Sequence, residues 1–210
     1  ARPGHLEGRP RVPADAVNIG VALFEGAEEL DWAGPWEVLA AWALQWPDDG
    51  VHVFTLAREE RPVTCAKGLR VLPDETWETA PPLDVLVYPG GRGTRRELQD
   101  EAVLDWISGL AAGDTVVASV CTGSLVLAAA GLLDGKPATT HWGSLELLPT
   151  LGREIEVRPD DRFVDNGNIL TAAGVSAGID MALHLVARLH STERAREVRR
   201  YIQYDPEPPV

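Results

Sequence analysis

Four short apolar runs constrain the fold of this chain most strongly. They are VNIGVALF at 17–24, VHVFTLA at 51–57, LDVLVYPGG at 83–91 and TVVASV at 115–120. Nearly continuous runs rich in β-branched residues are typical of strands that are buried on both faces. Segments with helical spacing lie between some of these runs, at 36–46 and 100–113, and another follows from Ser176 onward. Strands that alternate with helices predict an α/β fold with a mostly parallel sheet covered on both faces.

Particular residues mark where the expected elements begin and turn. Pro35 is suited to the first turn of the helix at 36–46, and Ser176 is a favourable N-cap for the late helix. The sequence DNGN at 165–168 is a hairpin signal between short strands. Asp31 is then expected in a short loop after the first strand, at the carboxyl edge of the sheet.

Cys121 occupies the junction between the strand at 115–120 and the apolar helical segment that follows without a loop. This is the pattern of a nucleophile elbow, in which small neighbours such as Ser119, Gly123 and Ser124 relieve crowding. A helix N-terminus favours a thiolate, so a depressed pKa is expected for Cys121. The alternative is that Cys121 is a small buried hydrophobic residue, which is the commonest fate of a free cysteine. Cys65 lacks such a junction and is expected to be structural.

Two further features are expected at the same edge of the sheet. Gly90 and Gly91 end the strand at 83–91, and the backbone N–H groups of Gly91 and Thr122 are suited to form an oxyanion hole. A simple turn is the alternative for the glycine pair. Asp31 is an acidic candidate there, although an aspartate in a loop is more often solvated or caps a helix.

Composition excludes several other classes of protein. The formal net charge is −13 and the pI is about 4.7, which disfavours nucleic-acid binding. The two cysteines form neither a disulfide framework nor a zinc motif, so a cytoplasmic location is expected. No metal or organic cofactor is expected. No signal peptide or membrane-spanning segment is expected. We expect a loose N-terminal arm at 1–16 and a single domain at 17–210.

Five motifs in order resemble those of the ThiJ/PfpI superfamily. They are GAEELDWAGPWEVL, VLVYPGGRGT, ASVCTGSLVLAAAGLLDGKPATTHW, NILTAAGVSAGIDMALHLV and YDPEPPV. The resemblance implies a flavodoxin-like three-layer sandwich related to class I glutamine amidotransferases, and a homodimer. Within the superfamily the chain is most similar to the isonitrile hydratase group, and it is related to the amino-terminal domains of AraC-type regulators.

The resemblance also implies roles for individual residues. Cys121 would be the nucleophile, Asp31 its acidic partner, and Gly91 the second glycine of the oxyanion loop. Thr122 stands where the protease-like branch of the superfamily has histidine. A peptidase or amidase needs a proton donor for the leaving amine. His184 lacks the adjoining glutamate of the glutaminases, and His141 is expected to be a structural histidine, so both activities are disfavoured.

The implied function is that of an isonitrile hydratase, a lyase. In this hypothesis Cys121 attacks the terminal carbon of R–N≡C, and Asp31 protonates that carbon to give a thioimidate. Water then adds with Asp31 as base, and an N-substituted formamide is released. Hydrogen bonds from Thr122 and Gly91 would stabilise the tetrahedral intermediate.

Two alternatives remain open. The first is a non-enzymatic sensor of oxidants or of a small ligand, and the second is a glyoxalase-like hydrolase that acts on small carbonyls. A transcription-factor role is disfavoured because no helix-turn-helix follows the domain, although a longer chain would hide one. Trp32, Trp36 and Trp142 lie in or beside the motifs. They are expected to pack in the core, with pocket lining as the alternative.

Overall fold

The computed structural model describes residues 16–207, and residues 1–15, most of the predicted arm, lie outside the described residues. A seven-stranded sheet runs through the middle in the order β10–β11–β7–β6–β1–β2–β5. Its strands are β1 (Val17–Ala22), β2 (Val51–Ala57), β5 (Glu75–Thr76), β6 (Val85–Tyr88), β7 (Val116–Val120), β10 (Phe163–Asp165) and β11 (Ile169–Ala172). Every neighbouring pair is parallel except β10 with β11. The predicted mostly parallel sheet is confirmed.

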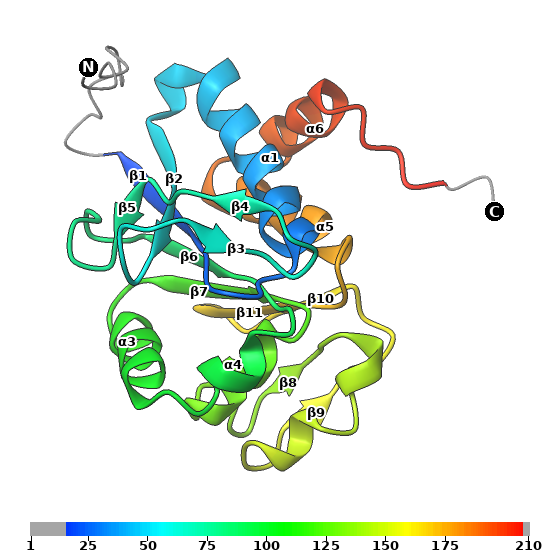
Figure 1. The fold of residues 1–210 in the computed structure, drawn as a ribbon. Coiled ribbons are helices and arrows are strands. Elements are labelled where there is room, and N and C mark those ends of the chain that lie inside the picture. Colours follow the sequence, from blue (N-terminus) through cyan, green and yellow to red (C-terminus); the bar gives the residue numbers. More distant parts are fainter. Residues whose placement is uncertain (1–15, 208–210) are drawn as a thin grey trace, which may run out of the picture.

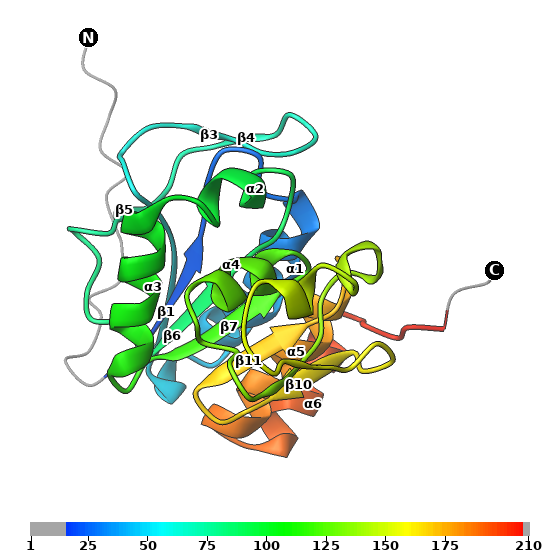
Figure 2. The ribbon, with the colours of Figure 1, turned by 90° about the horizontal axis from the view of Figure 1, so that it is seen from below.

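Helices cover both faces of the sheet (Figure 1). On one face lie α1 (Glu29–Gln45), α5 (Ala177–Leu189) and α6 (Thr192–Tyr201), and on the other α3 (Glu101–Ala112) and α4 (Gly123–Ala129). Figure 2 shows α3 and α4 in front of the sheet and the other three helices behind it. This is the expected three-layer sandwich. The central strands β6 and β7 are buried along their whole length because both faces are covered.

Short elements make up the connections. They are η1 (Pro47–Asp49), β3 (Val63–Thr64), β4 (Arg70–Val71), α2 (Thr94–Glu97), β8 (Pro137–Ala138), η2 (Trp142–Ser144), η3 (Leu148–Thr150) and β9 (Glu156–Val157). β3 pairs with β4 in an antiparallel hairpin, whereas β8 and β9 form a separate parallel pair. The predicted hairpin at 165–168 is also present, because β10 and β11 flank that turn and pair antiparallel.

One predicted helix start is wrong, and a second helix starts where predicted but without the expected capping hydrogen bond. The first helix begins at Glu29 instead of Trp36, so Pro35 lies inside α1 and Asp31 belongs to its first turn instead of a loop. The Glu28 N–H, just before the helix, donates to the Gly90 carbonyl at 2.9 Å and thereby ties this earlier start to β6. Ser176 precedes α5, but its side chain makes no capping hydrogen bond. Its hydroxyl instead accepts a long hydrogen bond from Arg162, at 3.4 Å.

Strand register places the residues of interest at one edge. Val21 of β1 lies beside Val87 of β6, and Tyr88 lies beside Ser119 of β7. Val120 in turn lies beside Ala172 of β11. Because the strands are parallel and aligned, the segments that follow them emerge side by side, which is where ligands bind in such sheets.

Candidate active site

Cys121 lies in a strained backbone conformation between β7 and α4. Its φ angle is +57°, in the left-handed region that residues other than glycine rarely adopt. The Cys121 N–H donates to two carbonyls at the end of β11, those of its last residue Ala172 at 3.1 Å and of the following Ala173 at 3.0 Å. The backbone therefore turns sharply at the sheet edge and holds the thiol above it. This is the predicted nucleophile elbow.

Small and hydroxylated residues hold this turn in place. The hydroxyls of Ser124 and Thr140 donate to the Cys121 carbonyl, at 3.0 and 2.9 Å. A Cβ at Gly123 would come within 2.6 Å of the Tyr88 carbonyl oxygen, so no larger residue fits there without a backbone shift. The expectation that a small residue at Gly123 relieves crowding at the elbow is confirmed.

Asp31 reaches the same point from α1 and is fully buried, with 0% of its surface exposed. One carboxylate oxygen, Oδ2, accepts the Gly90 N–H at 2.9 Å. The other, Oδ1, is buried and accepts no hydrogen bond from a nitrogen or oxygen atom of the described residues. The Cys121 thiol lies against this carboxyl group. The structure thus brings together the two residues that the sequence separates by ninety positions.

Burial controls the protonation of this pair. It raises the pKa of Asp31 to about 7, although the Gly90 N–H and the Cys121 thiol act in the opposite direction. Burial, and next the charge of Asp31, raise the pKa of Cys121 to about 12, whereas the Thr122 and Val175 N–H groups lower it. The predicted depression of the Cys121 pKa is wrong. The N–H groups of Thr122 and Val175 favour the thiolate, but they do not offset the rise in pKa caused by desolvation and by the neighbouring carboxylate.

Gly91 and Thr122, predicted to form an oxyanion hole, lie together beside Cys121, but their hydrogen bonds differ from the expectation. The Gly91 N–H donates to the Thr122 hydroxyl at 2.9 Å, so it supports that hydroxyl and is not free. The Thr94 hydroxyl donates to the Gly91 carbonyl at 2.7 Å and contacts the Thr122 hydroxyl at 3.2 Å. Gly91 has a φ angle of +119°, and a Cβ there would lie 2.4 Å from the Glu28 nitrogen. Only glycine fits this position.

A cavity of about 410 Å³ opens over Cys121. Besides Cys121, Thr122 and Gly91, it is lined by Glu28, Arg92, Arg95, His141, Gly143, Ser144 and Val175. Cys121 itself is 5% exposed, so the sulfur lies at the bottom of the cavity. A small molecule can therefore reach the thiol, whereas the carboxyl group of Asp31 stays behind it.

Val175 and Thr140 are site residues that the sequence analysis missed. Val175 has a φ angle of +45°, which is strained for a β-branched residue, and its N–H faces the Cys121 sulfur. A signal was available for Val175, because the segment AAGVS follows β11 at the same sheet edge as Cys121. No signal marked Thr140, which follows the short strand β8 and reaches the elbow from a separate two-stranded sheet.

His141 lines the cavity, whereas His184 lies outside it. His141 is half-buried and lines the cavity, and its Nδ1 accepts the Gly143 N–H at 3.1 Å. No hydrogen bond joins it to Cys121 among the described residues, and its contact with Gly143 caps η2. His184 instead contacts Asp165 at 2.7 Å, away from the cavity lining.

The tryptophans near the motifs do not line the cavity. Trp32 is buried and Trp36 packs against the core, as expected. Trp142 is 79% exposed, so the expectation that it packs in the core is wrong. Its place in the short helix η2, beside the cavity mouth, directs it to solvent.

Sequence comparison shows to which family this site belongs. The model of the DJ-1/PfpI family matches residues 17–188. The chain belongs to the DJ-1/PfpI family. It is 46% identical over 194 residues to isonitrile hydratase from Pseudomonas putida, covering 92% of this chain and 81% of that protein. The sequence resemblance to the superfamily is thereby confirmed.

Other DJ-1/PfpI relatives include regulators and solved structures. The transcriptional regulator GbdR from Pseudomonas aeruginosa is 33% identical over 155 residues, which are 72% of this chain but 41% of the regulator. A ThiJ/PfpI family protein from Pseudomonas syringae superposes with a TM-score of 0.83 at 32% identity, covering 98% of this chain and 86% of that one. DJ-1β from Drosophila melanogaster, at 24% identity and a TM-score of 0.77, covering 90% of this chain and 99% of that one, shares the fold.

Neither a metal cluster nor a membrane-spanning helix is found in the described part of this DJ-1/PfpI chain. Within residues 16–207, no group of three or more histidine, cysteine or acidic side chains is arranged to hold a metal ion. None of the helices there is long and apolar enough to cross a membrane.

Proposed function

We propose that this protein is a cysteine-dependent isonitrile hydratase that converts R–N≡C and water into an N-substituted formamide. The observation that carries the proposal is the buried Cys121–Asp31 pair at the bottom of a small-molecule cavity. The 46% identity to an isonitrile hydratase supports it. A nucleophile and one carboxyl group are the groups that this hydration needs, because no amine leaves and no second acid is required.

Above pH 7 the Cys121–Asp31 pair holds one proton, and this determines how the reaction begins. With the pKa of Asp31 near 7 and that of Cys121 near 12, Asp31 is the carboxylate and Cys121 the thiol above pH 7. In the proposed first step, Asp31 takes the thiol proton as sulfur attacks the terminal carbon of the isonitrile. Asp31 then gives that proton to the same carbon, which yields the thioimidate R–N=CH–S–Cys121. The two residues titrate as a coupled pair.

Hydrolysis of the thioimidate uses the same carboxylate. Asp31 accepts a proton from water as the hydroxide adds to carbon, and it passes this proton to the nitrogen. Collapse of the tetrahedral intermediate expels the Cys121 thiolate, which recovers a proton from the new hydroxyl group through Asp31. The net reaction adds one water molecule and leaves both residues as they began.

Backbone groups and the Thr122 hydroxyl are suited to stabilise the charges that develop. The Thr122 and Val175 N–H groups face the sulfur, so they are positioned to stabilise the thiolate. The Thr122 hydroxyl, which accepts from Gly91 N–H, is the donor that we assign to the oxygen of the intermediate. Gly91 acts through this hydroxyl, and becomes a direct donor only if that hydrogen bond opens.

Turnover of simple alkyl isonitriles by freshly reduced protein tests the proposal, with the formamide product measured by chromatography. We expect formamide from the wild type and none from Cys121→Ala. Absence of product across several isonitriles, with conversion of methylglyoxal to lactate, would instead support the glyoxalase-like alternative. The proposal includes a cytoplasmic homodimer, and light scattering after size-exclusion chromatography tests the dimer.

A further inference from the structure

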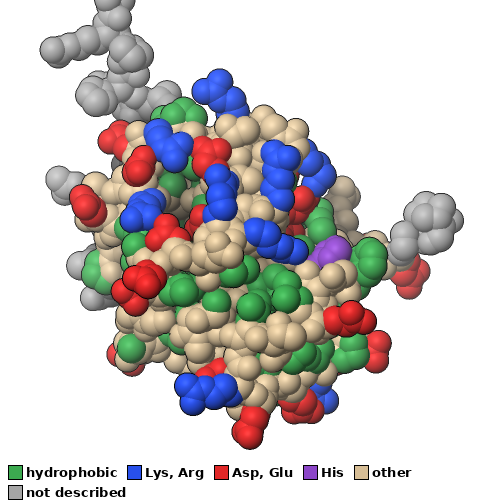
Figure 3. All heavy atoms as spheres, turned by 60° about the horizontal axis from the view of Figure 1, so that its bottom comes forward, with side chains coloured by type: hydrophobic (Ala, Val, Ile, Leu, Met, Phe, Trp, Pro, Cys, Tyr) green, Lys and Arg blue, Asp and Glu red, His purple; other side chains and the backbone are tan. Residues whose placement is uncertain are grey.

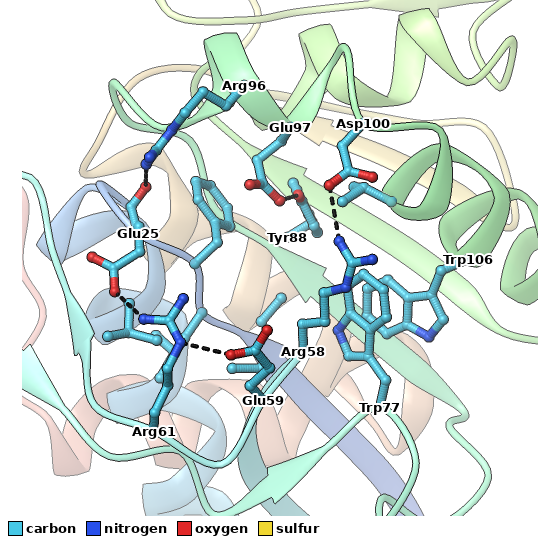
Figure 4. A pocket seen from close by; sticks show the side chains of 16 residues that line it. Glu25, Arg58, Glu59, Arg61, Trp77, Tyr88, Arg96, Glu97, Asp100 and Trp106 are labelled. Carbon is cyan, nitrogen blue, oxygen red and sulfur yellow. Dashed lines mark hydrogen bonds and ion pairs between the residues drawn. The ribbon is translucent and has the colours of Figure 1, made fainter.

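A second cavity, of about 280 Å³, opens at the same edge of the sheet and does not contain Cys121. It lies where β1, β2 and β6 end, and α2 and α3 close it from the side (Figure 4). We call it the α2 pocket and define it by Phe24, Arg58, Arg61, Tyr88, Arg96 and Glu97. Its position is that of a ligand site in a parallel sheet, but the proposed isonitrile chemistry does not use it.

The inner wall of the α2 pocket is aromatic. Tyr88 is almost fully buried, and its ring stacks on that of Phe24 with 5.3 Å between centroids. On the other side, Trp77 stacks on Trp106 at 4.2 Å, and the guanidinium of Arg58 lies over Trp77. An aromatic wall of this kind is typical of sites for small organic molecules.

Charged side chains surround the cavity, and most of them neutralise one another (Figure 4). Arg58 pairs with Asp100 at 2.9 Å. Arg61 pairs with both Glu25 and Glu59, at 2.8 Å each. These contacts satisfy two of the three arginines and three of the four carboxylates that line the cavity.

Arg96 and Glu97 remain without an ion-pair partner within residues 16–207. Arg96 donates only to the Glu25 carbonyl, at 2.8 Å, and Glu97 accepts the Tyr88 hydroxyl at 3.0 Å. Both residues belong to α2, and both side chains extend toward the cavity in Figure 4. A guanidinium prefers a carboxylate as its partner, and a cationic group would stabilise the half-buried Glu97 carboxylate beyond what the Tyr88 hydroxyl provides.

We propose that the α2 pocket binds a small zwitterion of the α-amino acid type that carries an apolar side chain. Its carboxylate would pair with Arg96 and its ammonium group with Glu97. Its side chain would pack on the stacked rings of Phe24 and Tyr88. Arg96 and Glu97 both line the cavity, so one small ligand that carries both charges can contact the two of them.

The surroundings of Glu97 agree with this occupant. Burial raises the pKa of Glu97, and the charge of Asp100 acts in the same direction. An ammonium group beside Glu97 would stabilise the carboxylate and lower that pKa again. Near the raised pKa, binding should therefore release protons. In Figure 3, Lys and Arg side chains lie over part of the face with Asp and Glu side chains among them.

Calorimetric titration with L-phenylalanine and L-leucine tests the proposal. N-acetyl-L-phenylalanine, which keeps only the carboxylate, and L-phenylalanine amide, which keeps only the ammonium group, are the comparison ligands. We expect the zwitterions to bind at least about tenfold more tightly than either blocked form. The heat should also differ between buffers of different ionisation enthalpy, because protons are released. If neither amino acid binds at ~10 mM, or a blocked form binds as tightly, the proposal is wrong.

Variants locate the bound molecule. Glu97→Gln and Arg96→Gln should each weaken binding by about tenfold or more, whereas the exposed controls Glu101→Gln and Arg200→Gln should not. Cys121→Ala should bind as the wild type does, which separates this pocket from the proposed active site. Unchanged binding by both pocket variants, with circular dichroism showing that they are folded, would overturn the assignment.

Discussion

Cys65 and Cys121 are both free and buried, and burial raises the pKa of both thiols. Only Cys121 lies in the candidate active site. Cys65 follows β3 and is 0% exposed, and the Trp32 indole faces its sulfur. Cys121 has a cavity above it, an adjoining carboxyl group and two N–H groups aimed at the sulfur. Burial and thiol pKa therefore do not distinguish the proposed nucleophile from the other cysteine of this protein. A neighbour that can take the thiol proton does.

The largest expected effect comes from removing each sulfur in turn. Cys121→Ala should reduce isonitrile turnover to the background rate, because Cys121 is the only thiol among the described residues that line the cavity. Cys65→Ala, which leaves the elbow untouched, should retain turnover within about twofold. Formamide measured by chromatography checks both variants. Substantial turnover by Cys121→Ala would invalidate the comparison.

Removing the proton acceptor should make Cys121 more like Cys65. Asp31→Asn should lower kcat/KM by roughly 10²–10⁴-fold, because general acid–base catalysis is lost. Alkylation of Cys121 by iodoacetamide at pH 9 should be retained or become faster, because the charge of Asp31 is one cause of the raised thiol pKa. Mass spectrometry identifies the alkylated cysteine. Normal turnover by this variant would show that Asp31 is not the acid and base.

The same substitution should affect stability in a pH-dependent way. The pKa of Asp31 is raised from 3.8 to about 7, so the folded state favours the protonated carboxyl group. The wild type should lose stability as the pH rises through this interval. Asp31→Asn avoids the buried charge and should be about 1–3 kcal/mol more stable than the wild type at pH 8, but not at pH 4. Urea denaturation at the two pH values measures this difference, and equal differences would contradict a raised pKa.

Turnover should follow the protonation of the pair. Below pH 7 both groups hold a proton and no base is available, so kcat/KM should fall about tenfold per pH unit below about 7. Above pH 7 the rate should stay level, since the pKa of Cys121 is about 12. A rate that instead rises between pH 8 and 10 would indicate a thiol that ionises without Asp31.

The smallest effect is expected at the hydroxyl that Gly91 supports. Thr122→Val removes the acceptor of the Gly91 N–H and the donor assigned to the intermediate. We expect a loss of about tenfold in kcat, with KM little changed, because the bond would form only in the transition state. Thr122→Ser keeps the hydroxyl and is the matched control. If both variants lose activity equally, packing of the methyl group is responsible and the hydroxyl is not.

The mostly parallel sheet and the elbow could be predicted because both depend on local patterns. Runs of buried residues mark β1, β6 and β7, and the abrupt change of period marks Cys121. The start of α1 could not be predicted in this way. Pro35 resembles a helix-starting residue, but contacts with β6 extend the helix back to Glu29. A distant hydrogen bond outweighed the local propensity.

The electrostatics of the site also depend on distant parts of the chain. The sequence places Cys121 at a helix N-terminus, which by itself predicts a low thiol pKa. Desolvation and the charge of Asp31 reverse that direction, and both exist only when α1 packs beside the elbow. Thr140 likewise reaches the site from a segment that no local pattern connects to it.

The sequence by itself determined the fold class, the elbow and the identities of Cys121 and Asp31 as candidates, because strand and helix periods and tight turns are encoded in neighbouring residues. Only the tertiary structure decided that Asp31 lies against the Cys121 thiol, which N–H groups face the sulfur, and that Arg96 and Glu97 lack ion-pair partners among residues 16–207. These properties depend on distance and on exclusion of water, which arise when segments far apart in the chain pack together.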